Sequence, residues 1–193
     1  MFRGKANLTS FMFDNLDTSI AEDMSTMFYQ CSGLKTLDLS NFNTSNVTNM
    51  SNMFRDCTSL ESIDLSSFNT NNVQSFQSFF NNCGKLSSIN FGDNFYAGNA
   101  TSVGYFFMKC ASLNSLDLTS WNTKKSTMFK SMFNQCTGLT EVKFGKDFSV
   151  DNAEDMSYMF YKCGKLNSID LSDWNTKKVK QFGHIFEECR SLK

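Results

Sequence analysis

The sequence contains no proline and only one histidine, His184, among its 193 residues. It also lacks a glycine-rich phosphate loop and any Ser/His/Asp or Cys/His constellation at a unique site. Catalysis needs one unique site, whereas this chain offers several similar positions. We therefore expect a protein that is not an enzyme and that carries no cofactor.

The chain has no excess of charge of either sign. Its formal net charge is −1, and no basic stripe follows a phosphate backbone, so nucleic acid is not an expected partner. No stretch is long and apolar enough to span a bilayer, and the N-terminus has no apolar run of signal-peptide length. We expect no direct membrane insertion, and a chain that is either cytosolic or a fragment of a longer protein. Its end at residues 191–193, where a strand should begin, favours a fragment.

Cysteine, in contrast, recurs at nearly constant spacing. Successive gaps of 26, 26, 27, 26, 27 and 26 residues indicate one structural unit repeated end to end. Stacked repeats form one continuous body, so we expect a single domain over residues 1–193. It divides into a half repeat at 1–20, six full repeats at about 21–178 and a truncated seventh at 179–193. The cysteines are Cys31, Cys57, Cys83, Cys110, Cys136, Cys163 and Cys189.

Each repeat combines two hydrophobic periods. In the second repeat, apolar residues between Val47 and Cys57 fall at helical spacing, whereas Ile63 and Leu65 alternate around Asp64 as in a strand. The pattern predicts helix, turn, short strand and turn in every unit. The expected fold class is an α/β solenoid with one short parallel strand and one short helix per repeat of 26–27 residues.

The two 27-residue gaps share a cause. The third and fifth strands run into Phe91-Gly92 and Phe144-Gly145 and carry one residue more than the other units. Glycine tolerates positive φ, so it can absorb the extra residue in a turn or bulge. Repeats about 4.8 Å apart would also bring equivalent side chains into ladders. Aromatic ladders are expected on the helix, at Phe28, Phe54, Phe80, Phe107, Phe133, Phe160 and Phe186, and after the strand, at Phe42, Phe68, Phe95, Trp121, Phe148 and Trp174.

Three interpretations of the cysteines remain open. The favoured one is a structural ladder of small buried side chains, because each cysteine lies in phase with the apolar stripe. Disulfides are a weaker alternative because the number is odd. A metal site is weaker still because no repeat contains a CxxC pair, so we expect no metal.

Polar side chains recur as well. The pairs Asn43-Thr44 and Asn69-Thr70 are expected to bond backbone groups in a turn or to cap the next helix. Asp38, Asp64 and their equivalents form a row on the outward side of the strands. A solvated, mildly acidic face is the simpler interpretation of that row, and calcium between neighbouring carboxylates is the alternative.

These units resemble the bacterial surface protein 26-residue repeat, also called the BspA-like leucine-rich repeat. The resemblance rests on the pattern Met-Ser-x-Met-Phe-x-x-Cys-x-x-Leu-x-x-Leu-Asp-Leu-Ser-x-Phe-Asn-Thr, at residues 24–44, 50–70 and, with Trp174 for Phe, 156–176. It implies a right-handed α/β solenoid with a parallel sheet along one face. It also implies cell-surface or secreted proteins, of bacteria and some protists, that attach to host or matrix proteins.

The leading functional hypothesis is a binding module that presents its sheet face to a protein or glycan ligand. The alternatives are a structural spacer that holds another domain, and a segment that self-associates through its open end. The expected contacts are the strand residues that the periodicity turns outward: Lys35, Thr36, Asp38, Glu61, Ser62, Asp64, Ser88, Asn90, Asn114, Ser115, Asp117, Glu141, Lys143, Asn167, Ser168 and Asp170.

Overall fold

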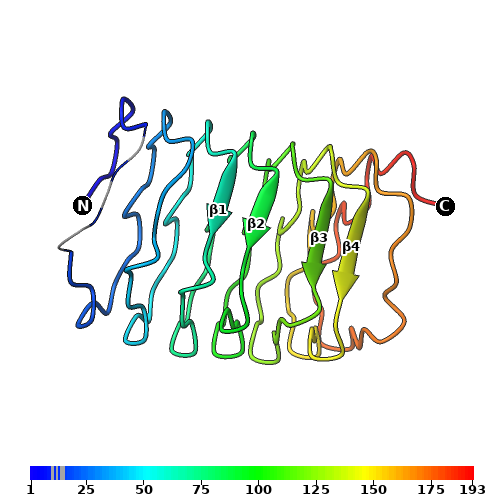
Figure 1. The fold of residues 1–193 in the computed structure, drawn as a ribbon. Helices are drawn as coiled ribbons and strands as arrows, with labels where there is room; N and C mark the ends of the chain where they lie inside the picture. The colour runs from blue at the N-terminus through cyan, green and yellow to red at the C-terminus, as the bar shows by residue number, and fades with distance from the viewer. Residues whose placement is uncertain (10, 12, 14–15) are drawn as a thin grey trace.

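The computed structural model describes residues 1–9, 11, 13 and 16–193. The chain winds into a row of coils that stack side by side from the N-terminus to the C-terminus (Figure 1). One hydrophobic core runs through the row from Phe13 to Leu166. The fold is therefore a solenoid of the leucine-rich-repeat type, as expected. Ser10, Met12, Asp14 and Asn15 of the expected half repeat lie outside the described residues.

Four strands occupy one side of the coils. They are β1 (Ser62–Asp64), β2 (Ser88–Asn90), β3 (Ser115–Leu118) and β4 (Glu141–Phe144). β1 pairs with β2 and β3 with β4, both in parallel, with Ser62 opposite Ser88 and Ser115 opposite Glu141. The strand expected in every repeat is thus found in the second to fifth repeats. The parallel sheet expected along one face is not continuous, because the described residues form two sheets of two strands.

The insertions coincide with the interruptions after β2 and after β4. Each pair of strands lies 26 residues apart, whereas the unpaired neighbours β2 and β3 are separated by a 27-residue gap. The extra residue follows β2 at Gly92, which has a left-handed φ of +64° that glycine adopts without the steric cost of a Cβ. A Cβ at Gly92 would lie 2.6 Å from Ser66 Cα of the preceding repeat. The same insertion follows β4, and pairing stops there too.

The prediction of a helix in every repeat is wrong. In the described residues, segments such as 47–57 form consecutive tight turns and no helix. Two residues four positions apart adopt left-handed φ values of 55–63° in each unit, for example Asn52 and Asp56. Left-handed residues break an α-helix, so the apolar spacing here belongs to a coil of turns.

Backbone hydrogen bonds show why turns replace the helix. In the first repeat, the amides of Met27, Tyr29 and Cys31 donate to carbonyls three residues back. The amides between them donate to the following repeat, as from Phe28 to Met53 O at 2.9 Å. An α-helix is about 10–12 Å wide and satisfies its amides internally, so it does not suit repeats stacked about 4.8 Å apart. Parallel bridges at the equivalent position link Asp23 through every repeat to Gln181.

The turn segments carry the longest aromatic stack. The rings from Phe28 to Phe186 lie 5.1–6.3 Å apart from one repeat to the next, within 21° of parallel. This confirms the expected ladder, although turns and not helices hold it. The second ladder stacks in pairs, including Phe95 with Trp121 at 5.6 Å and Phe148 with Trp174 at 5.9 Å.

Candidate functional site

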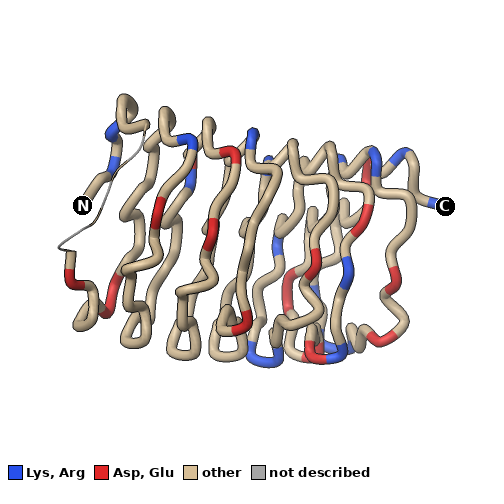
Figure 2. Tube along the Cα trace, viewed as in Figure 1, with Lys and Arg blue, Asp and Glu red and all other residues tan. Residues whose placement is uncertain are grey.

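The strand side of the solenoid carries the residues expected to make contacts. All sixteen of them, from Lys35 to Asp170, have exposed side chains in the structure. Isolated acidic positions recur from coil to coil across this side (Figure 2). The structure therefore brings these residues together as one extended polar surface, interrupted where β2 fails to pair with β3 and where β4 faces the sixth repeat.

The aspartates of this surface hold local turns. Asp38 Oδ1 accepts a hydrogen bond from the amide of Ser40 at 2.9 Å, and Asp64, Asp117 and Asp170 do the same two residues on. These hydrogen bonds keep the pKa of each carboxyl below its ordinary value. Each side chain is therefore ionised at neutral pH. Within the described residues, no three His, Cys, Asp or Glu side chains group as metal ligands.

The Asn-Thr pairs also hold turns, which confirms the structural interpretation. Asn43 Oδ1 accepts from the amide of Ser45 at 3.1 Å. The buried Thr44 hydroxyl donates to Asn69 O in the next repeat at 2.9 Å and accepts from its amide. The asparagine thus shapes its own turn and the threonine joins neighbouring repeats.

A groove of about 430 Å³ lies on the strand side between β4 and residues 168–174. Its rim includes Glu141 and Lys143 from β4 and Asp170 and Asp173 from the sixth repeat. In the described chain, no backbone hydrogen bond joins β4 to residues 168–171. The only nearby link runs from the amide of Asn167 to Thr140 O, at 3.4 Å. The groove therefore opens where the insertion after β4 interrupts the sheet.

Three aromatic rings line this groove, together with Val142 and Ile169. Phe144 lies 4.4 Å from Phe148 and 5.2 Å from Trp174, measured between ring centroids. Phe144 and Trp174 are only partly buried. The repeat pattern predicts Phe148 and Trp174 in a ladder, and it assigns none of the three rings to a site. The available signal was the inserted Phe144-Gly145 pair followed by a tryptophan in the next repeat.

The rim of the groove is mainly acidic. Three carboxylates line it, those of Glu141, Asp170 and Asp173, against the single ammonium group of Lys143. Lys143 Nζ lies 3.9 Å from Glu141 Oε1, and both side chains are more than half exposed. Such an exposed pair contributes little to stability and can reorganise around a ligand.

The cysteines lie in the interior, away from this surface. Six are buried and Cys189 is partly buried, and all seven are free thiols. Each Sγ donates to a phenylalanine carbonyl of the preceding repeat at 2.9–3.2 Å. Burial raises the pKa of every one of these thiols. They are therefore placed to join repeats and are poor nucleophiles.

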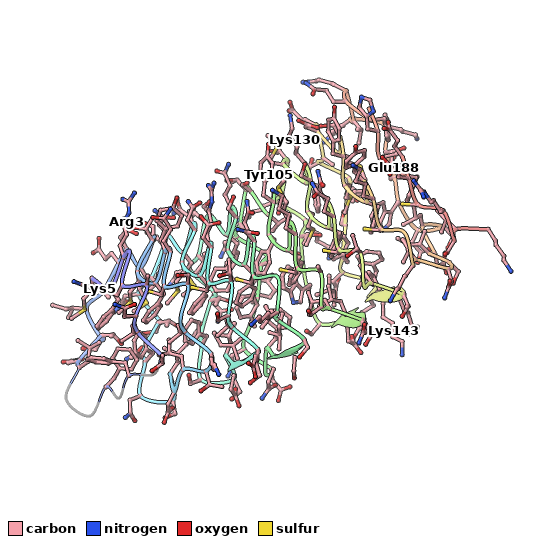
Figure 3. The ribbon with its side chains drawn as sticks, turned by 90° about the horizontal axis from the view of Figure 1, so that it is seen from above. Arg3, Lys5, Tyr105, Lys130, Lys143 and Glu188 are labelled. Atoms are coloured by element: carbon pink, nitrogen blue, oxygen red, sulfur yellow. The ribbon has the colours of Figure 1, made fainter. Side chains whose placement is uncertain are left out.

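The opposite side of the solenoid carries a second hollow of about 430 Å³, lined by Arg55, Asn82, Tyr105 and Lys109 among others. Figure 3 shows Tyr105 and Lys130 on this side and Lys143 on the other. The lining is polar, and some of its side chains already bond to one another across neighbouring repeats, such as Asn82 Nδ2 to Asp56 Oδ1 at 2.9 Å. The strand-side groove, with the partly exposed rings of Phe144 and Trp174, is the stronger candidate site.

The sequence matches the model of one protein family along its whole length. That family is described as "Mycoplasma protein of unknown function, DUF285", and the matches cover residues 1–115, 88–145 and 101–193. No curated protein sequence matches the chain. None of the described residues forms a helix long and apolar enough to cross a membrane.

Among solved structures, the chain is similar to a leucine-rich repeat protein from Eubacterium ventriosum. Their identity is 22%, the TM-score is 0.50, and the match covers 81% of this chain and 41% of that one. A leucine-rich repeat protein from Bacteroides ovatus matches at 22% identity and a TM-score of 0.46, over 87% of this chain and 44% of that one. The chain thus spans less than half the length of either protein. The first likeness supports the leucine-rich-repeat fold.

Proposed function

The chain belongs to the family described as Mycoplasma protein of unknown function, DUF285, with repeats of the BspA-like leucine-rich type, and on that premise we propose that it is a non-catalytic interaction module. Its ligand is a host or matrix protein, bound along the strand side. We propose that it acts at the cell surface or as a secreted protein. A glycan ligand on the same surface is the second form of this proposal.

The observation that carries the proposal is the row of exposed polar side chains on a rigid stack. The strand residues from Lys35 to Asp170 are exposed, while the hydrophobic residues between them are buried or partly buried. Backbone bridges from Asp23 to Gln181 hold the rows in register. Binding therefore costs little ordering of the backbone, which favours recognition by a broad, shallow surface.

The test is a binding measurement with purified matrix proteins immobilised on a sensor surface. The wild-type chain is compared with a variant that carries Glu61→Lys, Asn90→Lys and Asp117→Lys on the strand side. We expect the triple variant to lose at least about tenfold in affinity, because like charges and long side chains disrupt a complementary surface.

A matched variant controls for the added charge. It carries Glu22→Lys, Gln77→Lys and Asp151→Lys, which add the same charge at three exposed residues outside the strand segments. Circular dichroism and thermal unfolding check that both variants keep the fold. Equal loss of binding in the two variants, or unchanged binding in the strand-side variant, would contradict the assignment of this surface.

A further inference from the structure

We infer that the groove between β4 and residues 168–174 holds an arginine side chain of the partner protein. The inference rests on the proposed function, because it names the chemical group that an interaction partner would insert. The occupant follows from two features of the groove, the partly exposed rings of Phe144 and Trp174 and the acidic rim. It is the group around which the rest of the strand-side contacts would form.

The aromatic rings favour a flat cation. Trp174 lies 5.2 Å from Phe144 and 5.9 Å from Phe148, and its stack with Phe148 leaves it only partly buried. The faces of aromatic rings attract cations, and tryptophan does so best. A guanidinium group is planar and weakly hydrated, so it stacks on such a ring more readily than the compact ammonium group of lysine.

The rim supplies the opposite charge. Glu141, Asp170 and Asp173 outnumber Lys143, which already lies beside Glu141. Asp170 accepts a hydrogen bond from the amide of Ser172 at 3.0 Å, which lowers the pKa of its carboxyl and keeps it ionised. A carboxylate can accept further hydrogen bonds at its second oxygen. Two aspartates on one side of the groove therefore suit the forked donors of a guanidinium group.

The size of the groove agrees with this occupant. About 430 Å³ falls within the range of ligand pockets and exceeds what a single side chain fills. The remaining space would take the peptide on either side of the arginine. Because β4 makes no backbone hydrogen bond to residues 168–171 in the described structure, its edge is available to that peptide.

The test uses two short capped peptides, Gly-Arg-Gly and the same peptide with citrulline in place of arginine. Citrulline keeps the planar shape and removes the charge. Binding is followed by NMR through the indole N–H signals of the two tryptophans in the labelled wild-type chain. We expect the arginine peptide to shift the Trp174 signal saturably and leave Trp121 unchanged, with affinity at least about tenfold above that of the citrulline peptide and reduced by salt.

The matched variants are Asp170→Asn with Asp173→Asn, and Asp38→Asn with Asp64→Asn as the control, which removes two exposed carboxylates from the same side of the solenoid away from the groove. Asparagine keeps the turn at Asp170, because Asn90 already accepts a hydrogen bond from the amide of Gly92 in the same way. We expect the double variant to bind the arginine peptide at least about tenfold more weakly and the control to bind it as the wild type does. Equal binding of the two peptides, or unchanged binding in the double variant, would overturn the inference.

Combining this test with the matrix-protein measurement separates the two proposals. If the Glu61, Asn90 and Asp117 variant loses the matrix protein while the double aspartate variant binds it as the wild type does, the interaction module stands and the arginine site falls. If the arginine peptide binds with the expected dependence on Asp170 and Asp173 but no matrix protein binds the chain, the groove stands and the proposed function falls.

Discussion

The third and fifth repeats carry the same insertion. The tryptophan of the repeat after the first insertion is buried, whereas the tryptophan of the repeat after the second lines a groove. After β2, Trp121 is fully buried, with its ring 5.3 Å from Phe91 and 5.1 Å from Phe106. After β4, Trp174 contacts Phe144 and Phe148 and stays partly exposed. We call these the closed insertion and the open insertion.

The residue four positions before the cysteine accounts for part of the difference. In the fourth repeat this residue is Phe106, which packs against Trp121, whereas in the sixth it is Met159. The same inserted Phe-Gly therefore produces a filled core or an accessible groove, depending on the aromatic residues that neighbouring repeats contribute.

The largest expected effect is on stability when each tryptophan is truncated. Trp121→Ala should lower the free energy of unfolding by about 3–5 kcal/mol, because it leaves a large cavity in a fully packed region. Trp174→Ala should cost well under half as much, because its ring already meets solvent. Urea unfolding followed by circular dichroism measures both. Similar losses in the two variants would show that the insertions are packed alike.

The glycines of both insertions should be needed to a similar degree. Gly92→Ala forces an alanine to φ +64° and against Ser66, and at Gly145 a Cβ would meet the carbonyl of Thr119. Each change should lower the free energy of unfolding by about 1–3 kcal/mol. Gly183→Ala is the control, since a Cβ there has no atom within 4 Å. A neutral result at either insertion would contradict the close approach of the repeats there.

The pH dependence of stability should differ between two thiols, that of Cys110 near the closed insertion and that of Cys189 beyond the open insertion. Burial raises the pKa of the Cys110 thiol, so the unfolded chain releases this proton at lower pH than the folded chain. The free energy of unfolding should then fall as pH rises above 9.0, the ordinary pKa of a thiol, by up to about 1.4 kcal/mol per pH unit for this one group. Below that pH the contribution is fully present.

Cys110→Ala should make this pH dependence shallower, and Cys189→Ala, at a partly buried position, should change it less. Urea unfolding at a series of pH values from neutral to alkaline gives the slopes. Equal slopes in the wild type and the Cys110→Ala variant would contradict the burial of that thiol.

The smallest expected effect concerns the one cation on the rim of the open insertion. Lys143→Gln should strengthen binding of the arginine peptide about two- to fivefold, because it removes a like charge at an exposed position. Lys35→Gln, on the same side but in the first repeat, should leave the affinity unchanged. Isothermal titration of the peptide into each variant measures the difference. Weaker binding by the Lys143→Gln variant would assign this lysine to the ligand.

The sequence alone predicts the solenoid, its parallel strands and its ladders well, because a regular cysteine spacing requires equivalent residues to meet. The helix was wrong because tight turns place Met50, Met53 and Cys57 on one face much as a helix does. The left-handed positions could not be predicted from residue type, because residues as different as Asn52, Tyr105 and Lys162 occupy them.

The groove could not be predicted in the same way. The exposed strand residues follow from alternation, so Glu141, Lys143, Ser168 and Asp170 were named from the sequence. Whether Trp174 is covered depends on contacts between repeats and on the loss of pairing beside β4. Those are properties of the stack, and no single repeat encodes them.

The most direct test of the difference between the insertions is collisional quenching of tryptophan fluorescence by acrylamide. The chain has two tryptophans, so Trp174→Phe reports on Trp121 alone and Trp121→Phe on Trp174 alone. Phenylalanine keeps most of the packing at each position. We predict blue-shifted emission that acrylamide barely quenches from Trp121, and readily quenched emission from Trp174. Equal quenching of the two, or a protected Trp174, would contradict the open groove.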